Sequence, residues 1–337
     1  MRAVYIHGKE DLHIEEVPLP EPGEGQVRLR VAYVGVCGSD LHYYFDGAVG
    51  AYTITEPLTP GHELSATVDL DPSGKLAPGT PVTVHPATFG TPVPGAEDRP
   101  SVFPGGSYLG SASTHPHTQG GMAEYLVVRS DMIRVLPEGM DLRVAALSEP
   151  LGVGLHGINI AGDLEGKKVL VSGSGPIGLL TAAGALSKGA AEVVAADVLD
   201  GPLSRASQLG VTRTLRSDRD GLPANYFDVV LECTGVPPAV SNAFEAVRPA
   251  GLHVQVGMLA GGPQPLTIAP VISKEIEIRG SFRFNNEIDD AVQLLAERPE
   301  IADAVITHTM SADDPVAAFV TAKNSDLSGK VLVEMWL

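Results

Sequence analysis

The pattern of hydrophobic and polar residues divides the chain near residue 151. Before that point, short runs rich in β-branched and aromatic residues are separated by proline and glycine clusters such as PLPEPGEG and APGTP. Strands of this size and spacing are typical of a small barrel-like β domain. The predicted strands are MRAVYI, LHIEEV, QVRLRVAYV, ELSATVDL, TPVTVHP and MAEYLVVR.

After residue 151, near-continuous apolar runs alternate with segments of helical pattern. The run KKVLVSG (167–173) is followed by PIGLLTAAGALSKG, and the order repeats through EVVAADV, FDVVLECTG, LHVQVGM and EIEIRGSF. This alternation predicts an α/β fold with a parallel, doubly wound sheet. The closing run KVLVEMWL predicts one more strand, which returns to the first domain.

Residues 86–121 interrupt the β pattern with a stretch rich in glycine, proline, serine and threonine. Because this stretch has little periodicity, we predict a long surface excursion. His115 and His117 lie within it and are expected to be solvated.

Composition narrows the classes of function. The formal net charge is −18 over 337 residues, so the surface would repel nucleic acid and anionic lipid. The N-terminus lacks the order of a signal peptide, and glycine and proline break the longest apolar runs, so we expect no membrane span. With only Cys37 and Cys233 the chain has no disulfide scaffold, and we expect a reducing, cytoplasmic location.

A glycine-rich turn follows the strand KVLVS directly and opens a helix. The turn reads GSGPIG over 173–178, and its glycines let backbone N–H groups approach a pyrophosphate at the helix N-terminus. A glycine turn can also serve packing alone, but strand, helix and a later acidic residue are all in register here. The predicted cofactor contacts in this turn are Gly173, Gly175, Pro176, Ile177 and Gly178.

Asp197 ends the next predicted strand, where its carboxylate can accept hydrogen bonds from a ribose 2′-hydroxyl. Its charge, together with that of Asp200, would repel a 2′-phosphate. Arg205 is the nearest phosphate partner but lies about two helical turns further on. The sequence therefore predicts a preference for NAD over NADP.

A second group of residues has the chemistry of a catalytic zinc site. Cys37, His62, and Glu63 or Glu149 together offer a thiolate, an imidazole and a carboxylate, which leaves a fourth position open for water or substrate. Sulfur and nitrogen ligands favour zinc over magnesium. Each residue alone could be inert core or a satisfied polar group, so the prediction rests on their combination with the glycine turn.

These motifs together resemble the zinc-dependent medium-chain alcohol dehydrogenases, in the polyol branch of sorbitol and xylitol dehydrogenases. The resemblance runs over nearly the whole chain and is most specific in GVCGSDLHYY, PGHE, GGMAEY, SEPLGVGLH, GSGPIG, VQVGM and GSFRF. Within that branch, HYYFDGAVG and GSFRF are most similar to L-idonate 5-dehydrogenases. The family implies a GroES-like catalytic β-barrel over 1–152, a Rossmann domain over 153–287 and a C-terminal return to the catalytic domain over 288–337.

The resemblance also implies roles for individual residues. Ser39 matches the hydroxyl that contacts the bound alcohol, His42 a relay of its proton to solvent, and Glu149 a zinc ligand or the holder of a water near the substrate. Tyr43 and Arg283 match residues that contact the polyol. The remaining predicted cofactor contacts are Thr234, Val256, Gly257, Met258, Ser281, Phe282 and Arg283.

Two departures from the family pattern change the prediction. Many relatives hold a structural zinc with four cysteines in the lobe that corresponds to 86–121, and this chain has no cysteine there. We therefore predict one zinc per chain and leave homodimer and homotetramer open. Pro202 stands where the family has an arginine that binds the cofactor ribose.

The predicted reaction is NAD-linked oxidation of a secondary alcohol to a ketone. Arg283 could pair with a substrate carboxylate, which favours a sugar acid such as idonate, or bind the hydroxyls of a neutral polyol such as sorbitol or xylitol. A nucleotide-binding protein without catalysis is the alternative from another class, and it should lack some of the metal ligands or Ser39.

Overall fold

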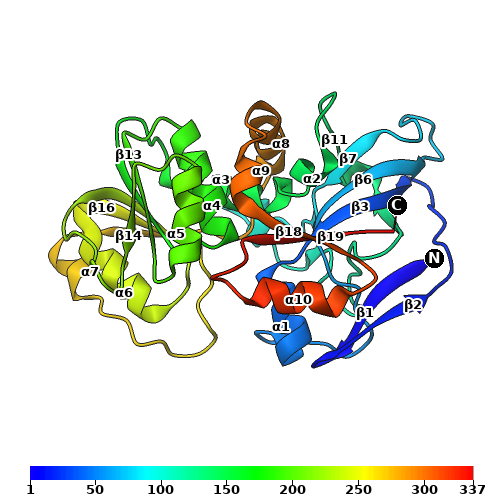
Figure 1. Cartoon of the computed structure of the whole chain (residues 1–337), viewed down its shortest axis with the longest axis horizontal. Helices are drawn as coiled ribbons and strands as arrows, with labels where there is room; N and C mark the ends of the chain where they lie inside the picture. Colours follow the sequence, from blue (N-terminus) through cyan, green and yellow to red (C-terminus); the bar gives the residue numbers. More distant parts are fainter. Residues whose placement is uncertain (337) are drawn as a thin grey trace.

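The computed structural model describes residues 1–336. The chain folds into two parts that lie side by side, a β-rich part that contains the N-terminus and a part built on a parallel sheet with helices (Figure 1). In the part of the chain described, no helix is long and apolar enough to cross a membrane.

The β-rich part is built on a seven-stranded sheet of order β11-β7-β6-β3-β19-β18, with β10 also paired to β3. Its strands are β3 (Gln26–Gly35), β6 (Glu63–Leu70), β7 (Pro81–Val84), β10 (Tyr125–Arg129), β11 (Ile133–Val135), β18 (Ile306–Ser311) and β19 (Lys330–Glu334). Three short pairs lie around it: β1 (Arg2–Gly8) with β2 (Asp11–Glu16), β4 (Ala48–Val49) with β5 (Tyr52–Thr53), and β8 (Ala87–Thr88) with β9 (Ser107–Tyr108). The remaining elements of this part are α1 (Gly38–Asp46), α2 (Leu142–Ala145), α10 (Pro315–Lys323), and the 3₁₀ turns η1 (Pro100–Val102) and η2 (Ser130–Met132).

The second part is a six-stranded parallel sheet of order β14-β13-β12-β15-β16-β17. Its strands are β12 (Lys168–Ser172), β13 (Glu192–Asp197), β14 (Arg213–Arg216), β15 (Phe227–Glu232), β16 (Val247–Gln255) and β17 (Glu277–Gly280). Its helices are α3 (Ser148–Ala161), α4 (Pro176–Ser187), α5 (Asp200–Gln208), α6 (Pro237–Ala246), α7 (Ala269–Ser273), α8 (Glu287–Glu297) and α9 (Ile301–Val305).

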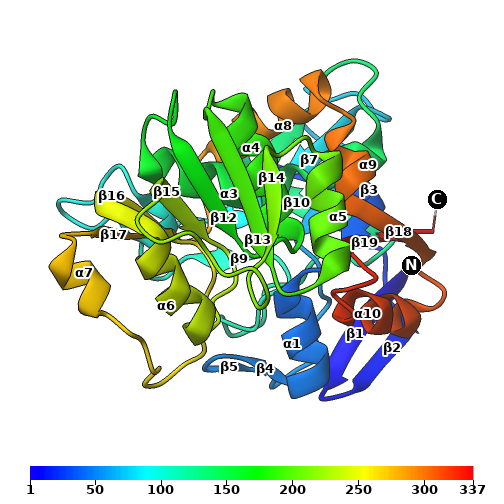
Figure 2. The same ribbon diagram turned by 60° about the vertical axis from the view of Figure 1, so that its left-hand side comes forward.

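Both faces of this sheet are covered, which explains why its strands are apolar at successive positions. Along β12, Val169 and Val171 belong to the core shared with α3 and α4, whereas Leu170 belongs to the core shared with α6. Figure 2 shows helices in front of and behind the strands. The predicted doubly wound sheet is confirmed.

The two parts are joined by more than one connection. Helix α3 runs through residues 152 and 153, so the predicted domain limit falls inside a helix. The predicted last strand is present as β19, which pairs antiparallel with β3 and parallel with β18. The chain therefore returns to the β-rich sheet after the parallel sheet is complete.

The prediction of a surface excursion over 86–121 was wrong for its second half. Tyr108, Leu109 and Ala112 are buried, and so is His117. Glycines allow this, because an added Cβ at Gly110 would lie 2.8 Å from the backbone nitrogen of Gly61. The segment thus packs against the loop that leads into β6.

Candidate active site and metal centre

Cys37, His62 and Glu63 come together in the structure, with one potential ligand atom of each within 4.8 Å of the others. Strand β3 ends at Gly35, and Gly35 is the Cα partner of Glu63, the first residue of β6. The antiparallel register therefore brings Cys37, just beyond β3, close to His62, just before β6. Cys37 is the N-cap of α1, and its backbone N–H donates to Asp40 Oδ2 at 2.9 Å.

The carboxylate of Glu63 is buried and paired with Lys330 from β19. Lys330 Nζ lies 2.7 Å from Oε1 and 2.5 Å from Oε2 of Glu63, and it also donates to the carbonyl of Val36 at 3.2 Å. Burial lowers the pKa of Lys330, but the charge of Glu63 outweighs this and raises it. Gly35 provides the space, because an added Cβ there would lie 2.2 Å from Glu63 Oε2.

This cluster fits a zinc ion. A thiolate, an imidazole and a carboxylate are the ligand types that zinc prefers. His62 is buried, and among residues 1–336 its Nδ1 has no hydrogen-bond partner. Burial lowers the pKa of His62, but the charge and hydrogen bond of Cys37, with the charge of Glu149, raise it to about 10. The surrounding anions therefore create a negative potential that favours a cation.

Glu149, the other predicted carboxylate ligand, has a different partner. It lies in the first turn of α3, is buried, and accepts a hydrogen bond from the hydroxyl of Tyr108 at 2.5 Å. It is not part of the three-residue cluster within the described chain. Burial raises the pKa of Glu149. Of the two carboxylates, Glu63 is thus the one beside Cys37 and His62.

Tyr108 was missed by sequence reasoning. Its ring lies edge-on to His62 with centroids 5.3 Å apart, and the Arg283 guanidinium carbon lies 4.2 Å from its centroid. Burial, followed by the charge of Glu149, raises its pKa well above the usual value. One aromatic side chain thus contacts three predicted site residues. A lone tyrosine in a glycine- and serine-rich stretch was the available signal.

The predicted residues of α1 have separate environments. Ser39 is half-buried and lies two positions after Cys37. His42 is exposed, and its Nδ1 lies 2.8 Å from Asp46 Oδ2 one turn later. Tyr43 is buried, and its hydroxyl accepts a hydrogen bond from the backbone N–H of Ala112 at 2.9 Å. The hydroxyl of Tyr43 is therefore engaged by the 108–112 segment.

A second group of potential ligands, Glu56, His115 and His117, has a structural explanation. His115 is exposed as predicted, but His117 is buried, so the prediction that it is solvated was wrong. Nδ1 of His117 lies 2.9 Å from the carbonyl of Thr114, and Nε2 accepts from the backbone N–H of Thr55 at 3.1 Å. Both ring nitrogens are therefore used to hold two loops together.

The glycine turn has the geometry that its sequence indicated. Gly173 has φ +93°, and an added Cβ at Gly178 would lie 1.9 Å from the carbonyl oxygen of Gly173. Gly175, the N-cap of α4, faces open space, and Pro176 begins the helix. Backbone N–H groups at this end of α4 can therefore bind a phosphate. Asp197, at the end of β13, accepts from the backbone N–H of Ser174 at 2.7 Å.

The arginines near Asp197 differ from the expectation. Arg205 is buried and donates to the carbonyls of Ser325, Asp326 and Ser328, so it is not free for a phosphate. Arg216, which sequence reasoning did not single out, is the Cα partner of Asp197 on β14. Its guanidinium contacts Asp200 at 2.6 Å and Asp218 at 3.0 Å.

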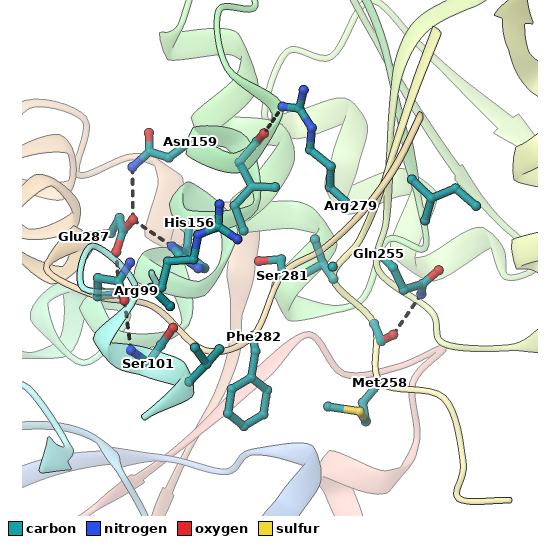
Figure 3. A pocket seen from close by; sticks show the side chains of 18 of the residues that line it. Arg99, Ser101, His156, Asn159, Gln255, Met258, Arg279, Ser281, Phe282 and Glu287 are labelled. Carbon is teal, nitrogen blue, oxygen red and sulfur yellow. Dashed lines mark hydrogen bonds and ion pairs between the residues drawn. The ribbon is translucent and has the colours of Figure 1, made fainter. Parts of the chain in front are cut away.

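Most of the other predicted cofactor contacts, but not Thr234 or Arg283, lie along a cavity of about 1070 Å³ between the 96–102 segment, α3 and the ends of β16 and β17 (Figure 3). Behind them, His156 Nδ1 lies 2.8 Å from Glu287 Oε1 and joins α3 to α8. The predicted contacts that line the cavity are Val256, Gly257, Met258, Ser281 and Phe282.

Comparison with known proteins places this geometry in a family. Residues 23–138 match the alcohol dehydrogenase GroES-like domain, and residues 176–297 match the zinc-binding dehydrogenase domain. The chain is 35% identical to the L-idonate 5-dehydrogenase (NAD(P)(+)) of Escherichia coli over 86% of each chain. The chain belongs to the zinc-dependent alcohol dehydrogenase family.

Further relatives agree. A sorbitol dehydrogenase of Gallus gallus is 33% identical over 96% of this chain and 94% of its own. The crystal structure of L-idonate 5-dehydrogenase from Escherichia coli superposes with a TM-score of 0.93 at 31% identity, covering 99% of this chain and 97% of the other. This zinc-dependent dehydrogenase therefore has a GroES-like part and a Rossmann part, as predicted, and is an NAD(P)-linked oxidoreductase.

Proposed function

We propose that this dehydrogenase oxidises a secondary alcohol of a sugar acid, with L-idonate or a close analogue as substrate, to the ketone. The observation that carries the proposal is the cluster of Cys37, His62 and Glu63, with Tyr108 against His62 and Arg283 against Tyr108. The resemblance to enzymes named L-idonate 5-dehydrogenase supports the sugar-acid class. A neutral polyol is the second candidate, supported by the sorbitol dehydrogenases.

Cys37, His62 and Glu63 would hold the zinc, and Glu149, fixed by Tyr108, would face the substrate without binding the ion. When bound, zinc supplies Lewis acidity that lowers the pKa of the alcohol. Ser39 would relay the hydroxyl proton, accepting it while giving up its own, and His42, exposed on the same helix and paired with Asp46, would pass a proton on to solvent. Lys330 would hold Glu63 in place through its two short contacts.

We propose that the cofactor is NAD rather than NADP. Asp197 would accept hydrogen bonds from the adenosine ribose, and its negative charge disfavours a 2′-phosphate. Arg216 is already paired with two carboxylates, and Arg205 with three carbonyls. The nicotinamide would lie against Val256–Met258 and Ser281–Phe282. NAD, when bound, would supply the hydride acceptor, and these residues of the chain would orient it.

One zinc per chain is proposed, because both ring nitrogens of His117 in the second cluster are hydrogen-bonded. We also propose that the protein is cytoplasmic, which its two free cysteines support. We further propose that it is a homodimer or homotetramer, which an edge strand of the parallel sheet supports. Within residues 1–336, β17 is the last strand of the parallel sheet, and Ile278 on it is 47% exposed. Such an edge favours pairing with a second copy.

The test is NAD reduction with a panel of aldonates and neutral polyols, using wild-type protein and Arg283→Ala. We expect L-idonate or a related aldonate to give the highest kcat/KM, and the variant to lose at least tenfold more activity on aldonates than on polyols. Equal losses on both classes would remove the carboxylate argument and favour the neutral polyol. Activity with NADP equal to that with NAD would contradict the role of Asp197.

A further inference from the structure

Three turns meet at the end of the parallel sheet where the cofactor is proposed to bind. They follow β12, β15 and β16, and they are here called the cofactor turns: residues 173–178, 234–235 and 256–258. The turns after β15 and β16 are in direct contact, because an added Cβ at Gly257 would lie 2.4 Å from the backbone nitrogen of Gly235. Glu232 and Gln255, the last residues of β15 and β16, are Cα partners in the sheet.

Glu232 is a fully buried carboxylate that receives hydrogen bonds from this edge of the sheet. Its Oε1 accepts from the backbone N–H of Thr234 at 3.0 Å and from the Thr234 hydroxyl. Its Oε2 accepts from the backbone N–H of Gly235 at 2.9 Å and from Gln255 Nε2 at 2.6 Å. Every one of these partners is a donor, and among residues 1–336 no lysine or arginine forms a salt bridge with Glu232. The arrangement therefore suits a carboxylate and no neutral side chain of the same shape.

The same residue also reaches the turn after β16. Its backbone carbonyl accepts from the N–H groups of Val256 at 2.9 Å and Gly257 at 2.8 Å. Gln255 Nε2, which donates to Glu232, also donates to the carbonyl of Gly257 at 2.8 Å. His253 fixes the amide of Gln255 from the other side, with Nε2 3.0 Å from Oε1. Side chain and backbone of Glu232 thus connect two of the three cofactor turns.

We infer that Glu232 is a positioning residue of the nicotinamide half of the cofactor site. Its carboxylate fixes the 234–235 turn against the 256–258 turn, whose backbone is proposed to hold the nicotinamide. The inference rests on the proposed function in so far as NAD is the cofactor. Replacement by glutamine would place an NH₂ group against donors at one oxygen position and leave those donors without a partner, which is costly in a buried site.

The experiment measures dissociation constants of NADH and ADP by calorimetry for zinc-loaded wild type and Glu232→Gln, with zinc content determined for both. ADP is included because it lacks the nicotinamide and its ribose. We expect Glu232→Gln to bind NADH at least tenfold more weakly, ADP less than threefold more weakly, and to retain its zinc. An NADH constant within twofold of wild type would overturn the inference, and so would equal losses for both nucleotides.

Asp228→Asn is the matched control. Asp228 lies on the same strand as Glu232 but near its other end, away from the cofactor turns, where its carboxylate accepts from the backbone N–H of Lys168 at 2.8 Å and from Arg248 Nε at 2.7 Å. Its replacement should leave the dissociation constant of NADH within twofold of the wild-type value. If Glu232→Gln does not fold, Gln255→Met removes the hydrogen bond to Glu232 instead and should weaken NADH binding about threefold. An unchanged NADH dissociation constant in Gln255→Met would overturn the inference. Failure of wild type to bind NADH would instead refute the proposed cofactor.

Discussion

The metal corner, defined by Cys37, His62, Glu63, Lys330, Tyr108 and Glu149, and the cofactor turns both bury polar groups at the ends of strands, but they are stabilised in different ways. In the metal corner, side chains distant in the sequence bind one another: Lys330 pairs with Glu63 and Tyr108 with Glu149. In the cofactor turns, most partners are backbone N–H groups within a few residues, as at Glu232 and Asp197, and these are supplemented by more distant donors, Gln255 and Ser174.

This difference has an energetic consequence. A buried charge whose partner is a single distant side chain is left unpaired by one substitution, whereas a carboxylate held by several local N–H groups keeps most of its partners. Substitutions in the metal corner should therefore have large effects that a second substitution can reverse. Substitutions around the turns should change cofactor affinity more than stability.

The largest effect is expected for Cys37. Cys37→Ser replaces the proposed thiolate ligand and should lower kcat/KM more than about 1,000-fold, because zinc supplies several kcal/mol to the reaction. Zinc content by atomic absorption should fall with it. Cys233→Ser changes the other cysteine, which contacts Thr181 and not the metal corner. Its kcat/KM should stay within about twofold of the wild-type value. Equal zinc content in both variants would argue against Cys37 as a ligand.

The sequence predicted the cofactor turns better than the metal corner for a physical reason. The turn at 173–178 is determined by its own glycines and flanking elements, so a local pattern was enough. The metal corner depends on Lys330 and Tyr108, whose contacts arise only when β19 joins β3 and the 108–112 segment packs inward. No local pattern marks such partners. For the same reason, the sequence left open whether Glu63 or Glu149 is the carboxylate ligand of the metal.

The next effect is expected for the Glu63–Lys330 pair. Lys330→Met leaves Glu63 buried without its cation and should lower the free energy of unfolding by about 3 kcal/mol. Because the folded pKa of Lys330 is raised, its contribution is complete below the unfolded value of 10.5 and is lost only as pH rises through the folded pKa. Urea unfolding of the metal-free protein at pH 7 is therefore a suitable measurement.

The double variant Glu63→Gln/Lys330→Met removes both charges and should recover at least half of the lost stability. Similar stability of wild type and Lys330→Met would show that the Glu63–Lys330 pair does not stabilise the metal corner.

A smaller effect is expected for Glu287, a carboxylate outside both regions. Burial raises its pKa, but the hydrogen bonds from His156 and Asn159 outweigh this and lower it to about 2. Its contribution is thus present above the unfolded value of 4.5 and is lost as pH falls toward 2. Wild type should lose about 2 kcal/mol in this window, after allowance for solvent screening, that Glu287→Gln does not lose.

Urea unfolding at several values of pH between 5 and 2.5 would measure the difference, with those values set by the expected window of titration. Glu297→Gln, at the exposed end of the same helix, should follow wild type throughout. Parallel curves for wild type and Glu287→Gln would show that the His156 contact contributes nothing.

The smallest effect is expected where a buried and a half-buried tyrosine make the same kind of bond. Tyr108 donates to Glu149 at 2.5 Å in the buried metal corner, and Tyr33 donates to Glu334 at 3.0 Å at the surface. Tyr108→Phe keeps the ring next to Arg283 but leaves Glu149 without this donor, which should cost about 1.5 kcal/mol. Tyr33→Phe should cost less than about 0.5 kcal/mol, because water replaces the lost partner. Thermal unfolding of the two variants measures the stability that each bond contributes. Equal losses would show that burial in the metal corner does not make the Tyr108–Glu149 bond contribute more than the bond at the surface.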